Sequence, residues 1–408
     1  MARSELENSR SRGNKDMLSS LPDPVLHHIM SFMPAWEAVQ LCVLSKRWKT
    51  LWTTLLVLNF GFRELRNNQL NHSSLNREKR FTDFVSTVLF LREATSQLHT
   101  LTLDCVNYYV VPGDVLCTSI RPWIRYAIKC NLRVLTIKNI FLPSEFFTCP
   151  SLEYVTLNIA GRIDTPEVIN LPSLKQLHLK ITSELGQDFM TKYTLELDQD
   201  FISKLLCGCP VLEDLHVEGG MVGFFKITSH SLKHLKFMTH CHKGSSELSE
   251  MTINCPNLLS FHFKMCYCQE KGIILNMPSL YEACIEFDIC TCEYDPIEMT
   301  KSNILCGLSN VHRLELGNYL DVSYLPEFNP LSSLLEHCPN LKKLSLDLSV
   351  CGDESKQIKV ARFKCEQLET VEVKFYEKDR IFRWVVKCLR EAVAELPNCR
   401  IIKTSAYH

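Results

Sequence analysis

The sequence predicts an α/β protein in which a few short N-terminal helices precede a solenoid with one parallel β-sheet. Within residues 16–55, apolar side chains recur at helical spacing, and prolines stand where helices begin and end. From about residue 98 onward one short apolar pattern recurs, as in stacked self-similar units. A chain of 408 residues is long for one compact core, so two or more units or an extended array are expected.

The N-terminal pattern predicts three short helices. Leu21-Pro22 opens the first helix, and Phe32-Met33-Pro34 closes it. Apolar positions of the second and third helices follow at Ala38, Val39, Leu41, Trp48, Leu51 and Trp52, with Ser45-Lys46-Arg47-Trp48 beginning the third. A segment of about forty residues is usually too small to fold stably alone, so we expect it to dock on a partner. Periodicity alone would also allow a helical cap on the downstream domain.

These ordered motifs resemble an F-box. The resemblance implies that residues 16–55 bind the Skp-type adaptor of a cullin-based ubiquitin ligase. The residues expected to contact the adaptor are Leu21, Pro22, Val25, Leu26, Ile29, Val39, Leu41 and Trp48.

Eleven copies of the pattern L-x-x-L-x-L fill the rest of the chain. They begin at Leu98, Leu132, Cys149, Leu171, Cys209, Ser231, Cys255, Met277, Leu308, Cys338 and Cys365. The pattern is the strand portion of a leucine-rich repeat, whose alternate apolar residues enter the core. The intervals from Leu174 to Leu212 and from Leu280 to Val311 are long, and residues 198–207 carry a helical pattern. Unrelated strands of an ordinary α/β domain would not repeat one register eleven times.

Both ends of the solenoid carry candidate caps. Amphipathic helices are expected before the second strand, at residues 81–91 and 123–128. A helix at 381–396 and a strand at 400–403 end the chain and resemble the FBD-type tail of plant F-box proteins. We therefore divide the chain into a flexible N-terminus (1–15), an F-box (16–55), a linker rich in asparagine, serine and arginine (56–80), the solenoid with its N-terminal capping helices (81–375) and an FBD-like cap (376–408).

The outward strand positions are polar and carry both charges, which suits a protein ligand recognised by side-chain complementarity. The candidate target-binding residues are Tyr154, His178, Lys180, Asp214, His216, His234, His262, Lys264, Arg313 and Lys343. His178, His216 and His262 occupy the same central position in different repeats, where metal binding or a proton switch can be imagined. We favour solvated polar residues there and assign no metal.

Composition excludes several classes of function. The net charge of −1 with 22% charged residues gives no argument for binding nucleic acid or an anionic membrane. No run of eighteen apolar residues occurs, and residues 1–16 lack a signal-peptide core, so an intracellular protein, cytoplasmic or nuclear, is expected. The twenty cysteines are then expected as thiols. Cys266-x-Cys268 and Cys290-x-Cys292 are candidates for a structural metal, but free buried thiols are favoured.

The chain has no glycine-rich phosphate loop, no G-x-S-x-G and no H-E-x-x-H motif. We therefore expect no catalysis and no cofactor. The prediction is a non-catalytic substrate receptor of a Skp–cullin–F-box ubiquitin ligase that binds an unknown target protein. The alternative is a leucine-rich-repeat scaffold that acts outside a ligase, with the helical N-terminus as a cap or a degenerate F-box.

Overall fold

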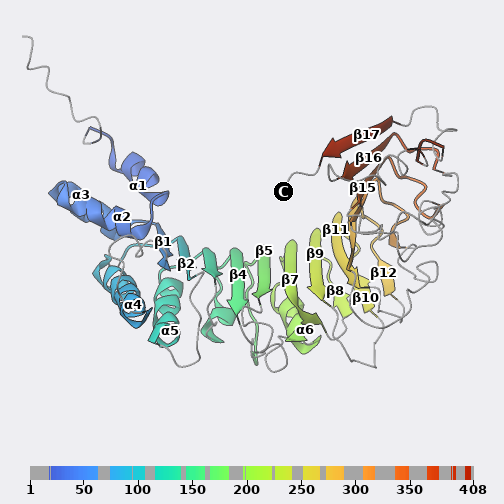
Figure 1. The fold of residues 1–408 in the computed structure, drawn as a ribbon. Coiled ribbons are helices and arrows are strands. Elements are labelled where there is room, and N and C mark those ends of the chain that lie inside the picture. The colour runs from blue at the N-terminus through green and yellow to red at the C-terminus, as the bar shows by residue number, and fades with distance from the viewer. Residues whose placement is uncertain are drawn as a thin grey trace, which may run out of the picture. The chain divides into compact units, whose positions relative to one another are not determined.

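A computed structural model describes residues 18, 20–62, 74–93, 95–105, 115–138, 144–160, 166–182, 196–197, 199–222, 226–240, 251–266, 273–288, 307–317, 336–348, 365–375, 387, 389–391 and 400–405. The chain forms two compact units, residues 1–146 and residues 147–408. Figure 1 labels most of the helices and strands of both units.

Three short α-helices begin the first unit: α1 (Asp23–Ser31), α2 (Ala35–Gln40) and α3 (Lys46–Leu51), with 3-10 turns η1 (Leu41–Val43) and η2 (Trp52–Thr54). Pro22 and Pro34 occupy the N-cap positions of α1 and α2, where extended backbone suits proline. Arg47 Nε donates a hydrogen bond to Asp23 Oδ1 at 2.8 Å, which ties α3 to the start of α1. The predicted three-helix arrangement is confirmed.

The first unit continues with β1 (Val57–Gly61), β2 (Thr100–Asp104) and β3 (Val134–Lys138), which pair in parallel in that order. Helices α4 (Ser74–Leu91) and α5 (Val115–Lys129) pack against each other, and the 3-10 turn η4 (Ser144–Thr148) follows. The two helices lie where capping helices were expected. Each strand buries its second and fourth residues, as alternation requires.

The prediction of a linker at 56–80 is wrong at both ends of that range. Strand β1 lies within it and pairs with β2, and α4 already begins at Ser74. Leu55, Leu58 and Phe60 repeat the L-x-x-L-x-L register with phenylalanine in the last position, and each is at most 2% exposed. The solenoid pattern therefore starts one repeat earlier than predicted. Residues 63–73 lie outside the described residues.

The second unit is a row of parallel strands paired in chain order, as predicted: β4 (Tyr154–Ala160), β5 (Gln176–Thr182), β7 (Asp214–Val222), β9 (His234–His240), β11 (Ser260–Cys266), β13 (Glu282–Asp288), β14 (Arg313–Gly317), β15 (Lys343–Leu348), β16 (Thr370–Phe375) and β17 (Arg400–Ser405). Helix α6 (Gln199–Gly208) lies where the helical insertion was expected, and β6 (Glu196–Leu197) pairs with β7. Of the expected C-terminal helix, only 387 and 389–391 are described.

The register stacks like residues on like. Leu177, Leu215 and Leu235 lie opposite one another on β5, β7 and β9, and each is at most 3% exposed. A leucine side chain stabilises the fold by roughly 1.5–3 kcal/mol when it is fully buried. Every strand thus completes the core of the next, which is why a single repeat cannot fold alone.

A second parallel sheet, which sequence reasoning missed, consists of β8 (Lys226–Thr228), β10 (Met251–Asn254) and β12 (Ile273–Asn276). Ile227 and Ile253 are fully buried on its central positions. In the sequence, Ile253 stands two residues before the Cys255 corner, and Leu275 stands two residues before Met277. This period-two alternation was the available signal for short strands.

The cysteine-proline corners are turns. The N–H of Leu258 donates to the carbonyl of Cys255, and Leu212 and Leu341 bond to Cys209 and Cys338 in the same way, at 3.1–3.2 Å. Proline after the cysteine sets the φ angle that the second position of such a turn needs. The corner thiols are at most 1% exposed, and burial raises the pKa of Cys209 and Cys338 to about 12 and of Cys255 to about 11. These buried corners agree with the prediction, whereas residues 268, 290 and 292 lie outside the described part of the chain.

The alternation predicts opposite effects at neighbouring positions of β4. Val155 is 1% exposed and Thr156 is exposed. Val155→Asp buries an unpaired carboxylate and should lower the free energy of unfolding by about 3 kcal/mol or more, whereas Thr156→Asp should change it by less than about 0.5 kcal/mol. Thermal melts of the two variants check this. Equal losses of stability would contradict the register.

Candidate functional site

Large apolar side chains are exposed on the first helix. Val25, Ile29 and Phe32 recur at helical spacing along α1 and its C-cap, and they are 42%, 39% and 75% exposed. We call these three residues the α1 stripe. Val43 and Leu44, at the end of η1, are 85% and 62% exposed. Clustered apolar exposure of this kind marks an interaction surface.

The residues predicted to contact an adaptor divide by burial. Pro22, Val25 and Ile29 are exposed, and Leu21, Val39 and Leu41 are half-buried. Leu26 and Trp48 are only 0% and 5% exposed, so their assignment to a docking surface is corrected: they hold the helices together. Spacing placed Leu26 on an apolar face but could not tell which apolar residues face the core.

Phe32, Val43 and Leu44 were missed as surface residues. The sequence pattern indicates Phe32 only as part of the motif that closes α1. Its position seven residues after Val25, on the same side of a helix, was the signal that could have found it.

The second unit carries the other candidate surface. We call the strand side chains that alternate with its buried residues the outward face. All ten predicted target-binding residues lie on described strands at these alternating positions. The register sets His178 opposite His216, and Arg313 opposite Lys343. Their role in binding a target stays a prediction, but their common side of the sheet is observed.

Ion pairs cross between neighbouring strands of the outward face. Lys180 Nζ lies 2.5 Å from Glu218 Oε1 between β5 and β7, and Arg313 Nη1 lies 2.9 Å from Glu282 Oε1. The hydrogen bond from Lys180 is the main reason that the pKa of Glu218 is lowered. Positive and negative side chains therefore alternate on the outward face, which does not carry charge of a single sign.

Two histidines meet on β5 and β7 of this face. The rings of His178 and His216 form an edge-to-face pair with centroids 5.1 Å apart. Burial, followed by the positive charge of Lys236, lowers the pKa of His216 to about 4. His216 is therefore neutral at physiological pH and acts as a polar ring rather than a cation.

A hollow of about 290 Å³ lies over β11, β13, β14 and β15 on the outward face. Its lining includes Ser260, His262, Glu282, Cys284, Arg313 and Lys343. Hydroxyl, carboxylate, imidazole and guanidinium groups converge there, so the hollow can recognise polar side chains of a protein ligand.

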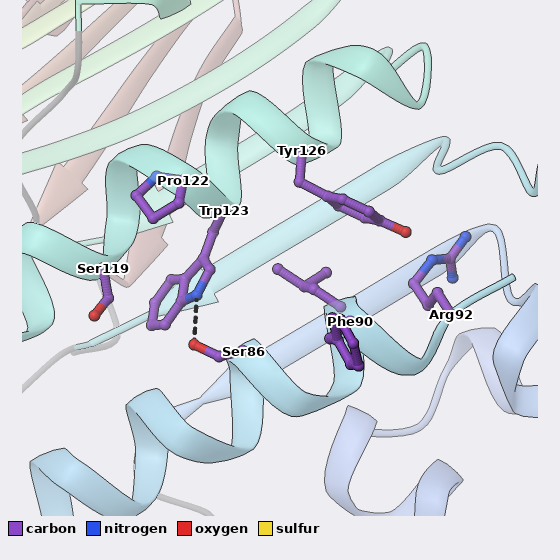
Figure 2. Close-up of a pocket in the computed structure, with 8 residues that line it drawn as sticks. Ser86, Phe90, Arg92, Ser119, Pro122, Trp123 and Tyr126 are labelled. Carbon is purple, nitrogen blue, oxygen red and sulfur yellow. Dashed lines mark hydrogen bonds between the residues drawn. The ribbon is translucent and has the colours of Figure 1, made fainter. Parts of the chain in front are cut away.

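A separate groove of about 350 Å³ lies between α4 and α5 of the first unit (Figure 2). Trp123 Nε1 donates to Ser86 Oγ at 3.0 Å across it, and Phe90 at its edge is 85% exposed. Arg92 donates to the carbonyls of Leu55 and Gln97. The contacts of Arg92 are intramolecular and anchor α4 to the corner before β1.

Within the described ranges, every helix is too short or too polar to cross a membrane.

Comparison with known proteins places these features in a family. The F-box domain family matches residues 18–59, and a family of leucine-rich repeats described from the FBD-associated F-box protein At5g56370 matches residues 121–281. The FBD-associated F-box protein At4g10400 of Arabidopsis thaliana is 30% identical over 356 residues, which cover 81% of this chain and 77% of that protein. The F-box/FBD/LRR-repeat protein At1g78750 of the same plant is 28% identical over 378 residues, 82% of this chain and 78% of its own.

Fold and matches together define a protein with an N-terminal F-box and a leucine-rich-repeat solenoid. The chain belongs to the family of plant F-box/FBD/leucine-rich-repeat proteins. An F-box implies binding to a Skp-type adaptor. The resemblance stated from the sequence is thereby confirmed.

The lowered pKa of His216 predicts acid sensitivity. The unfolded chain binds a proton at His216 near its ordinary pKa of 6.5, but the folded protein does so only near 4. The contribution of a neutral His216 is complete above pH 6.5 and is lost as the pH falls toward 4. Urea unfolding between pH 7 and pH 4 should show a shallower loss of stability in His216→Gln than in the wild type. Parallel profiles would contradict this, because the carboxylates shared by both proteins cancel in the difference.

Proposed function

We propose that this protein is the substrate-recognition subunit of a Skp–cullin–F-box ubiquitin ligase. The α1 stripe and the exposed residues near it would dock on the adaptor, and the outward face of the second unit would bind a target protein. One observation carries the proposal: the chain presents two surfaces of different chemistry on different elements, one apolar on the F-box and one polar with mixed charge on the repeats.

The two surfaces suit these two tasks for physical reasons. An exposed apolar stripe gains free energy from burial against a constant partner. A face of alternating charges gains specificity, since a wrong partner brings like charges together. The receptor itself does no chemistry in this proposal. It raises the effective concentration of a target lysine near a bound ubiquitin-conjugating enzyme. We propose that it acts in the cytoplasm or nucleus.

Adaptor docking is tested at the α1 stripe. Val25→Ala combined with Ile29→Ala should weaken binding to a Skp-type adaptor by about 2 kcal/mol or more, because both side chains are anchors that the partner would bury. Calorimetric titration of the purified protein with adaptor measures this. Phe90→Ala with Leu91→Ala is the matched control, since those residues are also apolar and exposed (85% and 53%) but lie on α4. Equal losses in both variants, or no loss at the stripe, would reject the assignment.

Target recognition is tested by exchanging one ion pair. Lys180→Glu with Glu218→Lys keeps the net charge and a β5–β7 ion pair but reverses the local polarity of the outward face. The exchange should abolish capture of the target in cells, while adaptor binding and the melting temperature stay unchanged.

The α1-stripe variant, Val25→Ala with Ile29→Ala, should have the reverse effect: target capture persists, ubiquitination falls and the target accumulates. If neither set of substitutions changes the ubiquitination or the abundance of the captured proteins, the protein acts as a scaffold outside a ligase.

A further inference from the structure

Three side chains with metal-binding chemistry meet on the outward face. His262 lies on β11 directly opposite Cys284 on β13, and Glu286 is two residues further along β13 on the same side of the sheet. Their ligand atoms, a ring nitrogen, Sγ and a carboxylate oxygen, all lie within 4.8 Å of one another. His262 Nε2 is 2.7 Å from Glu286 Oε1. All three residues are half-buried, so the cluster is sheltered but reachable.

The ligand set and its spacing fit Zn²⁺. Zinc binds imidazole nitrogen at about 2.0–2.1 Å, thiolate sulfur at about 2.3 Å and carboxylate oxygen at about 2.0–2.2 Å in a tetrahedral arrangement. Neighbouring ligand atoms in such a tetrahedron lie roughly 3.3–3.6 Å apart. The observed spacing of the three atoms brackets this value, so small side-chain rotations on fixed strands would suffice.

We propose that His262, Cys284 and Glu286 form a three-ligand site for Zn²⁺ or a divalent metal ion of the same ligand preference. His262 and Cys284 line the hollow of about 290 Å³, so the fourth coordination position would open into it. A site with three protein ligands keeps one position for water or an external group. The metal would link β11 to β13, and a side chain of a ligand in the hollow could bind to the open coordination position.

The surroundings leave room for the site and balance its charge. Gly317 lies opposite Glu286 on β14, and a Cβ at Gly317 would stand only 3.0 Å from Glu286 Cγ. Glycine at this position therefore gives the carboxylate its space. A thiolate and a carboxylate together neutralise the two positive charges of the metal ion. Lys236 lies opposite His262, and Lys264 lies opposite Glu286, so these two ammonium groups would lie beside a neutral complex and would not be repelled by an uncompensated metal ion.

The cluster escapes sequence reasoning because it depends on register. The three histidines His178, His216 and His262 share one column of the outward face, and the intervening strand β9 keeps His262 from joining the other two at one metal. Cys284 is the one cysteine in that column among the described strands. His262 thus finds its companions on the next strand rather than among the other histidines.

Cobalt titration of the full-length protein tests the site, since Co²⁺ bound by a thiolate gives a charge-transfer band. The wild type should bind Co²⁺ with this band and release it to Zn²⁺. Cys284→Ser should lose the band, and His262→Gln and Glu286→Gln should each bind Co²⁺ at least about tenfold more weakly. The matched controls are Cys207→Ser, which removes an exposed thiol, and His178→Gln, which removes another histidine of the column. Both controls should behave as the wild type.

Two results would overturn the proposal: no cobalt–thiolate band in the wild type, or an undiminished band in Cys284→Ser. Cys284→Ala provides a second variant if the serine fails to fold, as judged by circular dichroism. Adaptor binding takes no part in this measurement, so its outcome is independent of the ligase role.

Discussion

Alternation along parallel strands is the constraint on which the rest of the structure depends. A strand points successive side chains to opposite sides, and parallel pairing in register places equivalent residues beside one another. The leucines of successive repeats therefore form continuous buried columns, as Leu177, Leu215 and Leu235 do. Once the columns are fixed, the positions between them must face outward. The polar outward face is thus a consequence of the core.

Backbone hydrogen bonds at the corners keep the alternation in phase from one repeat to the next. In each corner the turn brings a leucine back to the start of a strand, as Leu258 does after Cys255. The N–H of the first strand residue then bonds to the preceding repeat, for example Asp214 to the carbonyl of Lys175. These bonds satisfy backbone groups that would otherwise be buried without partners. They also explain why insertions such as α6 do not shift the register. The inserted residues lie before the next corner, and the same hydrogen bonds form again at that corner.

The repeat pattern was strong enough to predict the fold class, the order of the strands and the outward residues. It missed β1 because the boundary drawn at residue 55 divided the copy formed by Leu55, Leu58 and Phe60 between the F-box and the linker. It missed β8, β10 and β12 because strands of three or four residues carry too little pattern. Helical spacing found the F-box but could not separate Leu26, which is buried, from Ile29, which is exposed. The closeness of His262 to Glu286 depends on pairing between strands, which local pattern does not encode.

The two faces of the sheet contribute very differently to stability, and this difference leaves the outward face free to vary. A buried leucine contributes roughly 1.5–3 kcal/mol, whereas an exposed cross-strand ion pair such as Lys180 with Glu218 contributes about 0–1 kcal/mol. Replacing outward residues therefore costs the fold little, while replacing a column residue endangers it. The α1 stripe differs from both faces. Its exposed apolar side chains do not stabilise the folded monomer, and their burial would contribute free energy only where a partner covers them. Substitutions on the outward face can therefore change its chemistry without loss of the fold, whereas the column residues cannot vary in this way.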